Sequence, residues 1–179
     1  MKNPALVTVL AATAVLSACA TSQLSPTVTA PENLKVPADQ VFALEMPATG
    51  VQIYECKAKK DEANKFEWVF RAPEAELNNQ AGAKTGRHYA GPTWEANDGS
   101  KVVGEVVAKN DGPDANAIPW LLLKAKSNAG SGVFSKVTSI QRVLTLGGKA
   151  PLTGCSQYQV GAEQRVPYKA VYNFYKARS

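Results

Sequence analysis

The feature that most restricts how this chain can fold is an alternation of side-chain character with a period of two. In the segment 166–176, one face carries apolar and aromatic side chains up to residue 174: Val166, Tyr168, Ala170, Tyr172 and Phe174. Residues 51–56 and 66–71 alternate in the same way. Successive side chains of a β-strand point to opposite faces of a sheet, so this period is typical of strands.

Further strands are expected at 93–95, 101–109, 118–125 and 137–146, with the Asp98-Gly99 dipeptide forming a tight hairpin turn. About eight strands with turn residues between them predict one all-β domain, either an antiparallel sandwich or a small barrel. A single short helical turn is expected at 73–77, where Pro73 suits the first turn and Glu74 and Glu76 suit the helix dipole.

The N-terminus combines a positive charge at Lys2, an apolar stretch over residues 5–16 and the sequence Leu16-Ser17-Ala18-Cys19. This arrangement resembles a bacterial lipobox, and the apolar stretch is shorter than the roughly 20 residues that a membrane span needs. The resemblance implies a signal peptide over 1–18 and acylation of Cys19, palmitate being one such chain. We expect a flexible tether over 19–32 and the β domain over 33–179.

Lipidation would hold the protein at a membrane of the cell envelope. In a Gram-negative cell, Ala20 after the cysteine implies the outer membrane, facing the periplasm. With Cys19 acylated, Cys56 and Cys155 remain as an even pair in an oxidising compartment. We therefore predict a disulfide between them.

The net charge of +5 is scattered along the chain, and basic residues such as Lys59 and Lys60 are followed by Asp61 and Glu62. Mixed charges of this kind favour a solvated hairpin tip, so no nucleic-acid partner is expected.

Several blocks occur in order along the predicted strands: Gly50–Cys56, Trp68–Leu77, His88–Glu95, Ile118–Ala125, Ser139–Val143 and Pro167-Tyr168. Together they resemble the domain of unknown function (DUF) family 3455, found in exported proteins, over about residues 34–176. The resemblance implies no particular activity, cofactor or catalytic set.

His88 is the sole histidine of the chain, so acid–base chemistry near neutral pH would fall to it first. Tyr89, Trp94 and Glu95 follow closely, and a pocket with an imidazole, an indole and a carboxylate could bind an envelope glycan or a small molecule. The alternative is that His88 is a hydrogen-bonded structural residue and Trp94 a core residue. Arg142, if it faces inwards, needs a carboxylate partner and could mark a ligand anion site; its strand leaves the two faces undecided.

Metal ligation and nucleophilic catalysis lack their usual spacings in this sequence, so no metal, cofactor or catalytic residue is assigned. The leading hypothesis is an envelope lipoprotein with a binding or structural role rather than an enzyme. The alternative is an exported hydrolase or carbohydrate-active enzyme that uses His88 and Glu95.

Overall fold

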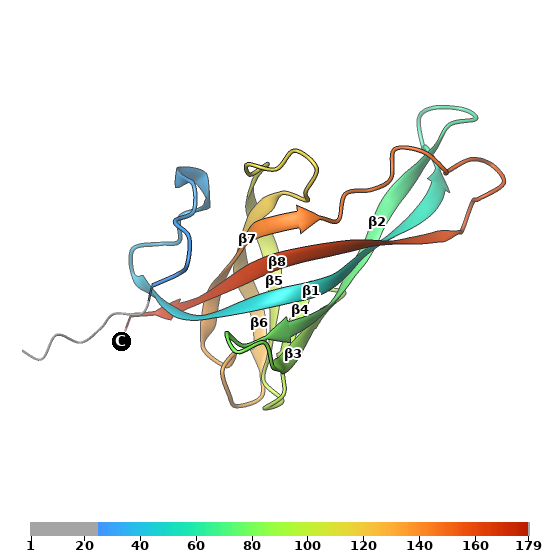
Figure 1. Cartoon of the computed structure of the whole chain (residues 1–179). Helices are drawn as coiled ribbons and strands as arrows, with labels where there is room; N and C mark the ends of the chain where they lie inside the picture. The colour runs from blue at the N-terminus through green and yellow to red at the C-terminus, as the bar shows by residue number, and fades with distance from the viewer. Residues whose placement is uncertain (1–24, 179) are drawn as a thin grey trace, which may run out of the picture.

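The computed structural model describes residues 25–178, which form a closed barrel of eight antiparallel strands (Figure 1). Each strand pairs with the next, and the last pairs with the first. This confirms the all-β prediction and selects the barrel. The elements are η1 (Glu32–Leu34), β1 (Gln40–Ala58), β2 (Phe66–Asn78), β3 (Lys84–Tyr89), β4 (Thr93–Ala96), β5 (Lys101–Asn110), β6 (Trp120–Ala129), β7 (Val137–Gly147) and β8 (Glu163–Ala177).

The predicted signal peptide over 1–18 and the lipidation site Cys19 lie outside the described residues. Within residues 25–178, no helix has the length and hydropathy needed to cross a bilayer.

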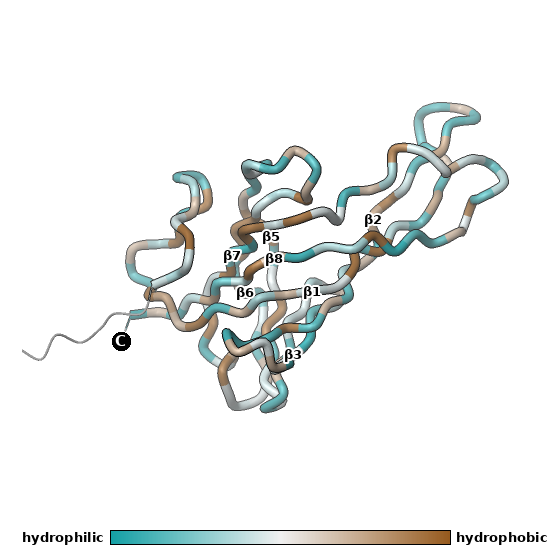
Figure 2. Tube along the Cα trace, viewed as in Figure 1, coloured by the Kyte–Doolittle hydropathy of each residue, from teal (hydrophilic) through white to brown (hydrophobic). Residues whose placement is uncertain are grey.

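Parts of β1, β2 and β8 extend beyond the barrel and form an arm, which comprises residues 53–72 and 149–166 (Figure 1). In this region β2 and β8 pair only with β1, because β3 first meets β2 at Ala75 and β7 first meets β8 at Tyr168. The loop at the tip of the β1–β2 hairpin is hydrophilic along most of its length (Figure 2).

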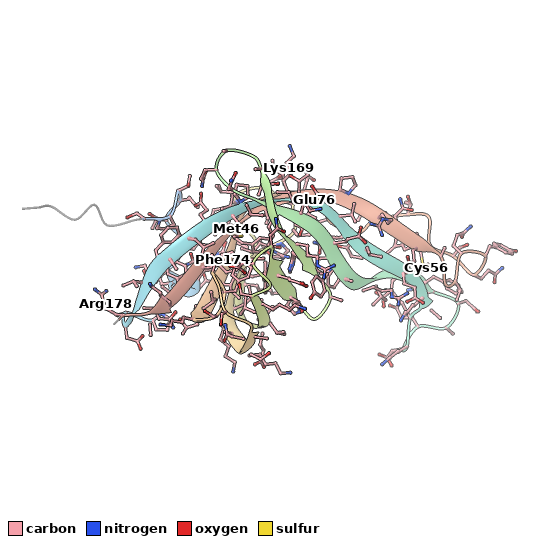
Figure 3. The ribbon with its side chains drawn as sticks, turned by 90° about the horizontal axis from the view of Figure 1, so that it is seen from below. Met46, Cys56, Glu76, Lys169, Phe174 and Arg178 are labelled. Atoms are coloured by element: carbon pink, nitrogen blue, oxygen red, sulfur yellow. A yellow bond between two sulfur atoms is a disulfide. The ribbon has the colours of Figure 1, made fainter. Side chains whose placement is uncertain are left out.

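A disulfide joins Cys56 and Cys155 across the arm, with their Cα atoms 5.4 Å apart, as the sequence predicted. Cys56 lies near the far end of β1, away from Met46 and Phe174 in the barrel (Figure 3). Backbone hydrogen bonds join Cys56 to Gly161 and Ala162, just before β8 begins. The disulfide therefore fastens β1 to the chain that leads into β8.

The barrel interior at the end away from the arm is filled by apolar side chains, among them Met46, Leu77, Phe134 and Phe174. Trp94 packs directly against β5, where residue 104 is a glycine. A Cβ atom at this position would lie 2.9 Å from the indole ring, so only glycine leaves room for the ring at this distance.

A strap formed by residues 27–36 covers the outer face of the strands near β7. The Thr27 hydroxyl donates to Glu45, and Leu34 is fully buried against three outward-facing side chains, Trp120, Leu122 and Val143. The contacts begin at Thr27, ahead of the domain start that we predicted at residue 33. Gln141 donates a hydrogen bond of 2.7 Å to the Leu34 carbonyl, so the polar outer face of β7 is also buried.

The helical turn predicted at 73–77 is wrong: this segment belongs to β2, and the short helix is η1 instead. Ala75 and Leu77 are buried while Glu74 and Glu76 are exposed, which is the period of a strand. Glu74 pairs with Arg165 and Glu76 with Lys84, so the two carboxylates serve ion pairs to other segments rather than a helix dipole. Pairing of β2 with β1 and β3 thus overrides the local preference of residues 73–77 for a helical turn.

Removing the disulfide is expected to destabilise the barrel. The double variant Cys56→Ala/Cys155→Ala should lower the free energy of unfolding by about 2–5 kcal/mol, because the bridge restricts a long loop of the unfolded chain. Chemical denaturation followed by circular dichroism measures this loss, and Thr153→Ala, at an exposed position beside the bridge, should leave stability unchanged. Thiol labelling of Cys56 and Cys155 in the unreduced native protein would contradict the disulfide.

Candidate functional site

A cavity of about 310 Å³ lies inside the barrel at the end that carries the arm. The register explains this position: Ala75 of β2 pairs with His88, so the β3–β4 turn runs alongside the residues of β2 that approach the arm. Phe70 and Val106, each half-exposed, belong to the lining. The full lining is Gln52, Phe70, Arg71, Pro73, His88, Gly91, Pro92, Trp94, Val106, Leu121, Leu123, Arg142 and Tyr172.

His88 and Trp94 form an aromatic part of the cavity wall. They are cross-strand partners in β3 and β4, and their rings stack at 4.4 Å between centroids. The ring of Tyr172, from β8, lies 5.0 Å from that of His88. The Nδ1 atom of His88 lies 2.9 Å from the Thr93 carbonyl oxygen, which can only accept. Nδ1 therefore carries the proton and Nε2 is left as an acceptor.

The pKa of His88 is lowered from 6.5 to about 3. Burial is the main cause, the hydrogen bond to Thr93 acts in the opposite direction, and the positive charge of Arg142 adds to the lowering. The imidazole is accordingly neutral at physiological pH. A histidine with so low a pKa is poorly suited to general acid or base catalysis near neutrality, which needs a pKa close to the working pH.

Arg142 of β7 faces the interior of the barrel. The sequence alone did not show whether its side chain points inwards or outwards. Arg142 is paired in register with Tyr172 of β8 and Leu121 of β6. Its Nε and Nη2 atoms donate to the Pro119 carbonyl oxygen at 3.1 and 2.8 Å. Among residues 25–178, no carboxylate lies within ion-pair distance of the guanidinium. Its charge thus lacks a counter-ion in the described part of the chain.

Two further donors of the lining have no hydrogen-bond partner among the described residues: Nε2 of Gln52 and Nε1 of Trp94. Gln52 is 2% exposed and Trp94 is 1% exposed, so solvent does not satisfy these groups in the static structure. Buried polar groups are normally hydrogen-bonded, and each exception has a cost of about 1–3 kcal/mol.

Tyr89 and Glu95 lie on the outer face of the barrel, away from His88. Glu95 pairs in register with Arg87, one position along from the pair of His88 and Trp94, so the two pairs occupy opposite faces. The Tyr89 hydroxyl donates to Glu95 at 2.8 Å, and Arg87 and Lys101 form ion pairs with the same carboxylate. The hydrogen bonds from Tyr89 and Arg87 lower the pKa of Glu95.

Of the five candidate residues, the structure therefore brings together His88, Trp94 and Arg142. The sequence analysis did not select Gln52. This polar residue lies an even number of positions after Met46 and Ala48, which are both buried, so the three side chains share one face of the strand. This shared face is the signal that could have identified Gln52. Among residues 25–178, no three His, Cys, Asp or Glu side chains gather closely enough to hold a metal ion.

A family model described as "Protein of unknown function (DUF3455)" matches residues 37–176. Neither a curated protein nor a solved structure matches the chain.

The neutral state of His88 predicts a specific pH dependence of stability. The unfolded histidine takes up a proton below about pH 6.5, whereas the folded one does so only near pH 3. The contribution of the neutral His88 to the free energy of unfolding is therefore complete above pH 6.5. It declines as the pH falls, with a slope that approaches about 1.4 kcal/mol per pH unit.

His88→Asn, which keeps a donor near the Thr93 carbonyl, should show a flatter decline between pH 6.5 and 5, a range above the ordinary pKa values of carboxyl groups. Chemical denaturation at a series of pH values measures both slopes. Parallel curves for the two proteins would show that His88 is not held neutral.

Proposed function

This chain belongs to the DUF3455 family of proteins of unknown function, and we propose that it is a lipid-anchored protein of the cell envelope whose barrel binds a small molecule. The observation that carries the proposal is the interior cavity, where buried polar groups without partners stand among apolar walls. Cavities of several hundred Å³ with mainly apolar linings and a few polar groups are the usual sites for small ligands.

A binding role is favoured over a catalytic one by the chemistry of the same lining. His88 is neutral, with a pKa of about 3, and no carboxylate belongs to the described residues that line the cavity. Glu95, which the enzyme hypothesis pairs with His88, is on the opposite face of the sheet and is occupied by Tyr89, Arg87 and Lys101. A small molecule fits this interior better than a glycan, because glycans need polar groups along their whole length.

The anchoring part of the proposal rests on the lipobox that ends at Cys19. Two or more acyl chains would give stable attachment, whereas one chain binds a membrane only marginally. In a Gram-negative cell we place the barrel on the periplasmic side of the outer membrane.

Lipidation is tested by growing an expressing bacterium with an alkyne-tagged fatty acid and then detecting the tag on the purified protein. The native chain should carry the tag, and Cys19→Ser should lose it. The variant Cys56→Ser/Cys155→Ser is the matched control and should keep it, because its lipobox is intact. A tag that persists in Cys19→Ser would refute acylation at this residue.

Ligand binding is tested with 3-phenylpropan-1-ol, a neutral compound with an apolar body. Isothermal titration calorimetry of the full protein in lipid nanodiscs, corrected with empty nanodiscs, should show saturable binding. Val106→Trp should weaken binding at least about ten-fold by filling the cavity mouth, since a bulky group displaces the ligand from its apolar contacts.

Val107→Trp is the control, because Val107 is as exposed as its neighbour, at 51% against 50%, but does not line the cavity. Its affinity should equal that of the native protein. Absence of saturable binding of both this alcohol and the acid of the same shape, 3-phenylpropanoate, or equal loss in both variants, would refute the binding proposal.

A further inference from the structure

We propose that the ligand of this cavity is a monocarboxylate with an apolar body, whose carboxylate group is held by Arg142 and Gln52; this inference rests on the binding role proposed above. It specifies the charge and the shape of the ligand from groups that the fold leaves without partners.

The first step is the charge of Arg142. Arg142 is partly buried, and a charge that is withdrawn from water is costly unless it is paired. Arg142 has five N–H donors, of which two are directed to the single carbonyl of Pro119. The guanidinium is thus fixed in place but not neutralised by any described residue. One further hydrogen bond joins it to the Tyr172 hydroxyl, and the N–H groups that are left can serve an anion.

The second step is the kind of hydrogen-bonding group that the residues of the lining carry. Arg142, Nε2 of Gln52 and Nε1 of Trp94 are all donors, and the latter two lack partners among the described residues. An ionised carboxylate is an acceptor with two oxygens, so it can satisfy several donors at once. A neutral alcohol carries a proton of its own and has one oxygen to offer. The set therefore favours a carboxylate over an alcohol of the same shape.

The third step is the number of charges. Arg71 also lines the cavity, but it forms ion pairs with Glu163 at 2.9 Å and with Glu55 at 3.5 Å. Arg142 is therefore the one cation of the described lining without a carboxylate partner, which matches a single negative charge.

The fourth step is the body of the ligand. Apolar side chains make up most of the remaining wall: Phe70, Pro73, Pro92, Val106, Leu121 and Leu123. Burial of apolar surface against them contributes roughly 25 cal/mol per Å² and requires no further polar groups on the ligand. A small carboxylic acid with an aromatic or aliphatic body suits such walls, whereas a polyhydroxylated acid would leave its hydroxyl groups unpaired.

The test compares 3-phenylpropanoate with 3-phenylpropan-1-ol, which differ in the carboxylate alone, by calorimetry of the full protein in nanodiscs at neutral pH. The native protein should bind the carboxylate about ten-fold or more tightly than the alcohol, because charge-assisted hydrogen bonds are about twice as strong as neutral ones. Arg142→Gln should remove this preference while the affinity for the alcohol is retained. That retained affinity shows that the variant is folded around an intact cavity.

Arg71→Gln is the matched control, an arginine of the same lining whose charge is already paired, and it should keep the preference. Gln52→Leu removes one donor without touching the charge and should reduce the preference for the carboxylate by several-fold.

Equal affinity of the native protein for the two compounds, or a preference that survives Arg142→Gln, would overturn the carboxylate assignment and leave the binding role in place. Failure of the native protein to bind either compound would refute both proposals. Octyl phosphate serves as a further probe: tighter binding than octanoate would overturn the monocarboxylate in favour of a phosphate.

Discussion

The pairing of β1 with β8 is the constraint on which the rest of the structure depends. It runs from Gln40 opposite Ala177 to Glu55 opposite Glu163, with one shift of register between Phe42 and Leu44, so a single long ladder joins the two ends of the domain. Closing a ladder between segments so distant in sequence has an entropic cost that grows with loop length. The disulfide offsets this cost at the right place, because Cys56 belongs to β1 and Cys155 precedes β8. The same two strands are thus joined by hydrogen bonds along the barrel and by a covalent bond in the arm.

The wall that carries Arg142 is covered on both of its faces. The interior face of β6 and β7 presents Leu121, Ile140 and Arg142, while their outer face carries Leu122 and Val143 under the strap. This part of the sheet therefore has no solvated face, whereas antiparallel sheets commonly expose one face to solvent. The carbonyl of Pro119 then fixes the guanidinium from the chain just before β6. A binding group held on covered strands keeps its position better than one on a loop.

The sequence predicted the strands and the disulfide because both depend on local signals, namely a period of two and an even pair of cysteines. Sandwich and barrel could not be distinguished, since the same alternation serves either one and closure depends on which distant strands meet. The helical turn at 73–77 was inferred from Pro73 and two glutamates, whose roles turn out to be set by pairing with other strands. Local composition cannot show such partners.

The sequence located only part of the candidate site, because it did not show which strand residues face the interior of the barrel. Between His88 and Glu95 the chain turns at Gly91, whose φ of +114° suits glycine, and the residues that face each other depend on the exact length of this turn. A shift of one residue would exchange Trp94 and Glu95 between the interior and the surface. Sequence reasoning grouped both with His88, whereas the register places only Trp94 beside it. Gln52 was not selected for the same reason: only the pairing of β1 with its neighbouring strands shows that the face with Gln52 points into the barrel.

The cavity lining brings the charge of Arg142 close to the neutral ring of His88. Arg142 carries a charge that no described carboxylate neutralises, and this charge, together with burial, holds His88 neutral. A protonated His88 would add a second unpaired cation beside Arg142, which does not match the singly charged ligand that we propose. As a neutral imidazole bonded to Thr93, His88 instead supplies a stacked surface against Trp94. Replacing the unpaired donors by apolar side chains would remove their desolvation cost, so the present arrangement is a poor solution for stability alone. It suits the carboxylate ligand that we propose, because Arg142 is the cation of the described lining without a carboxylate partner and His88 beside it stays neutral.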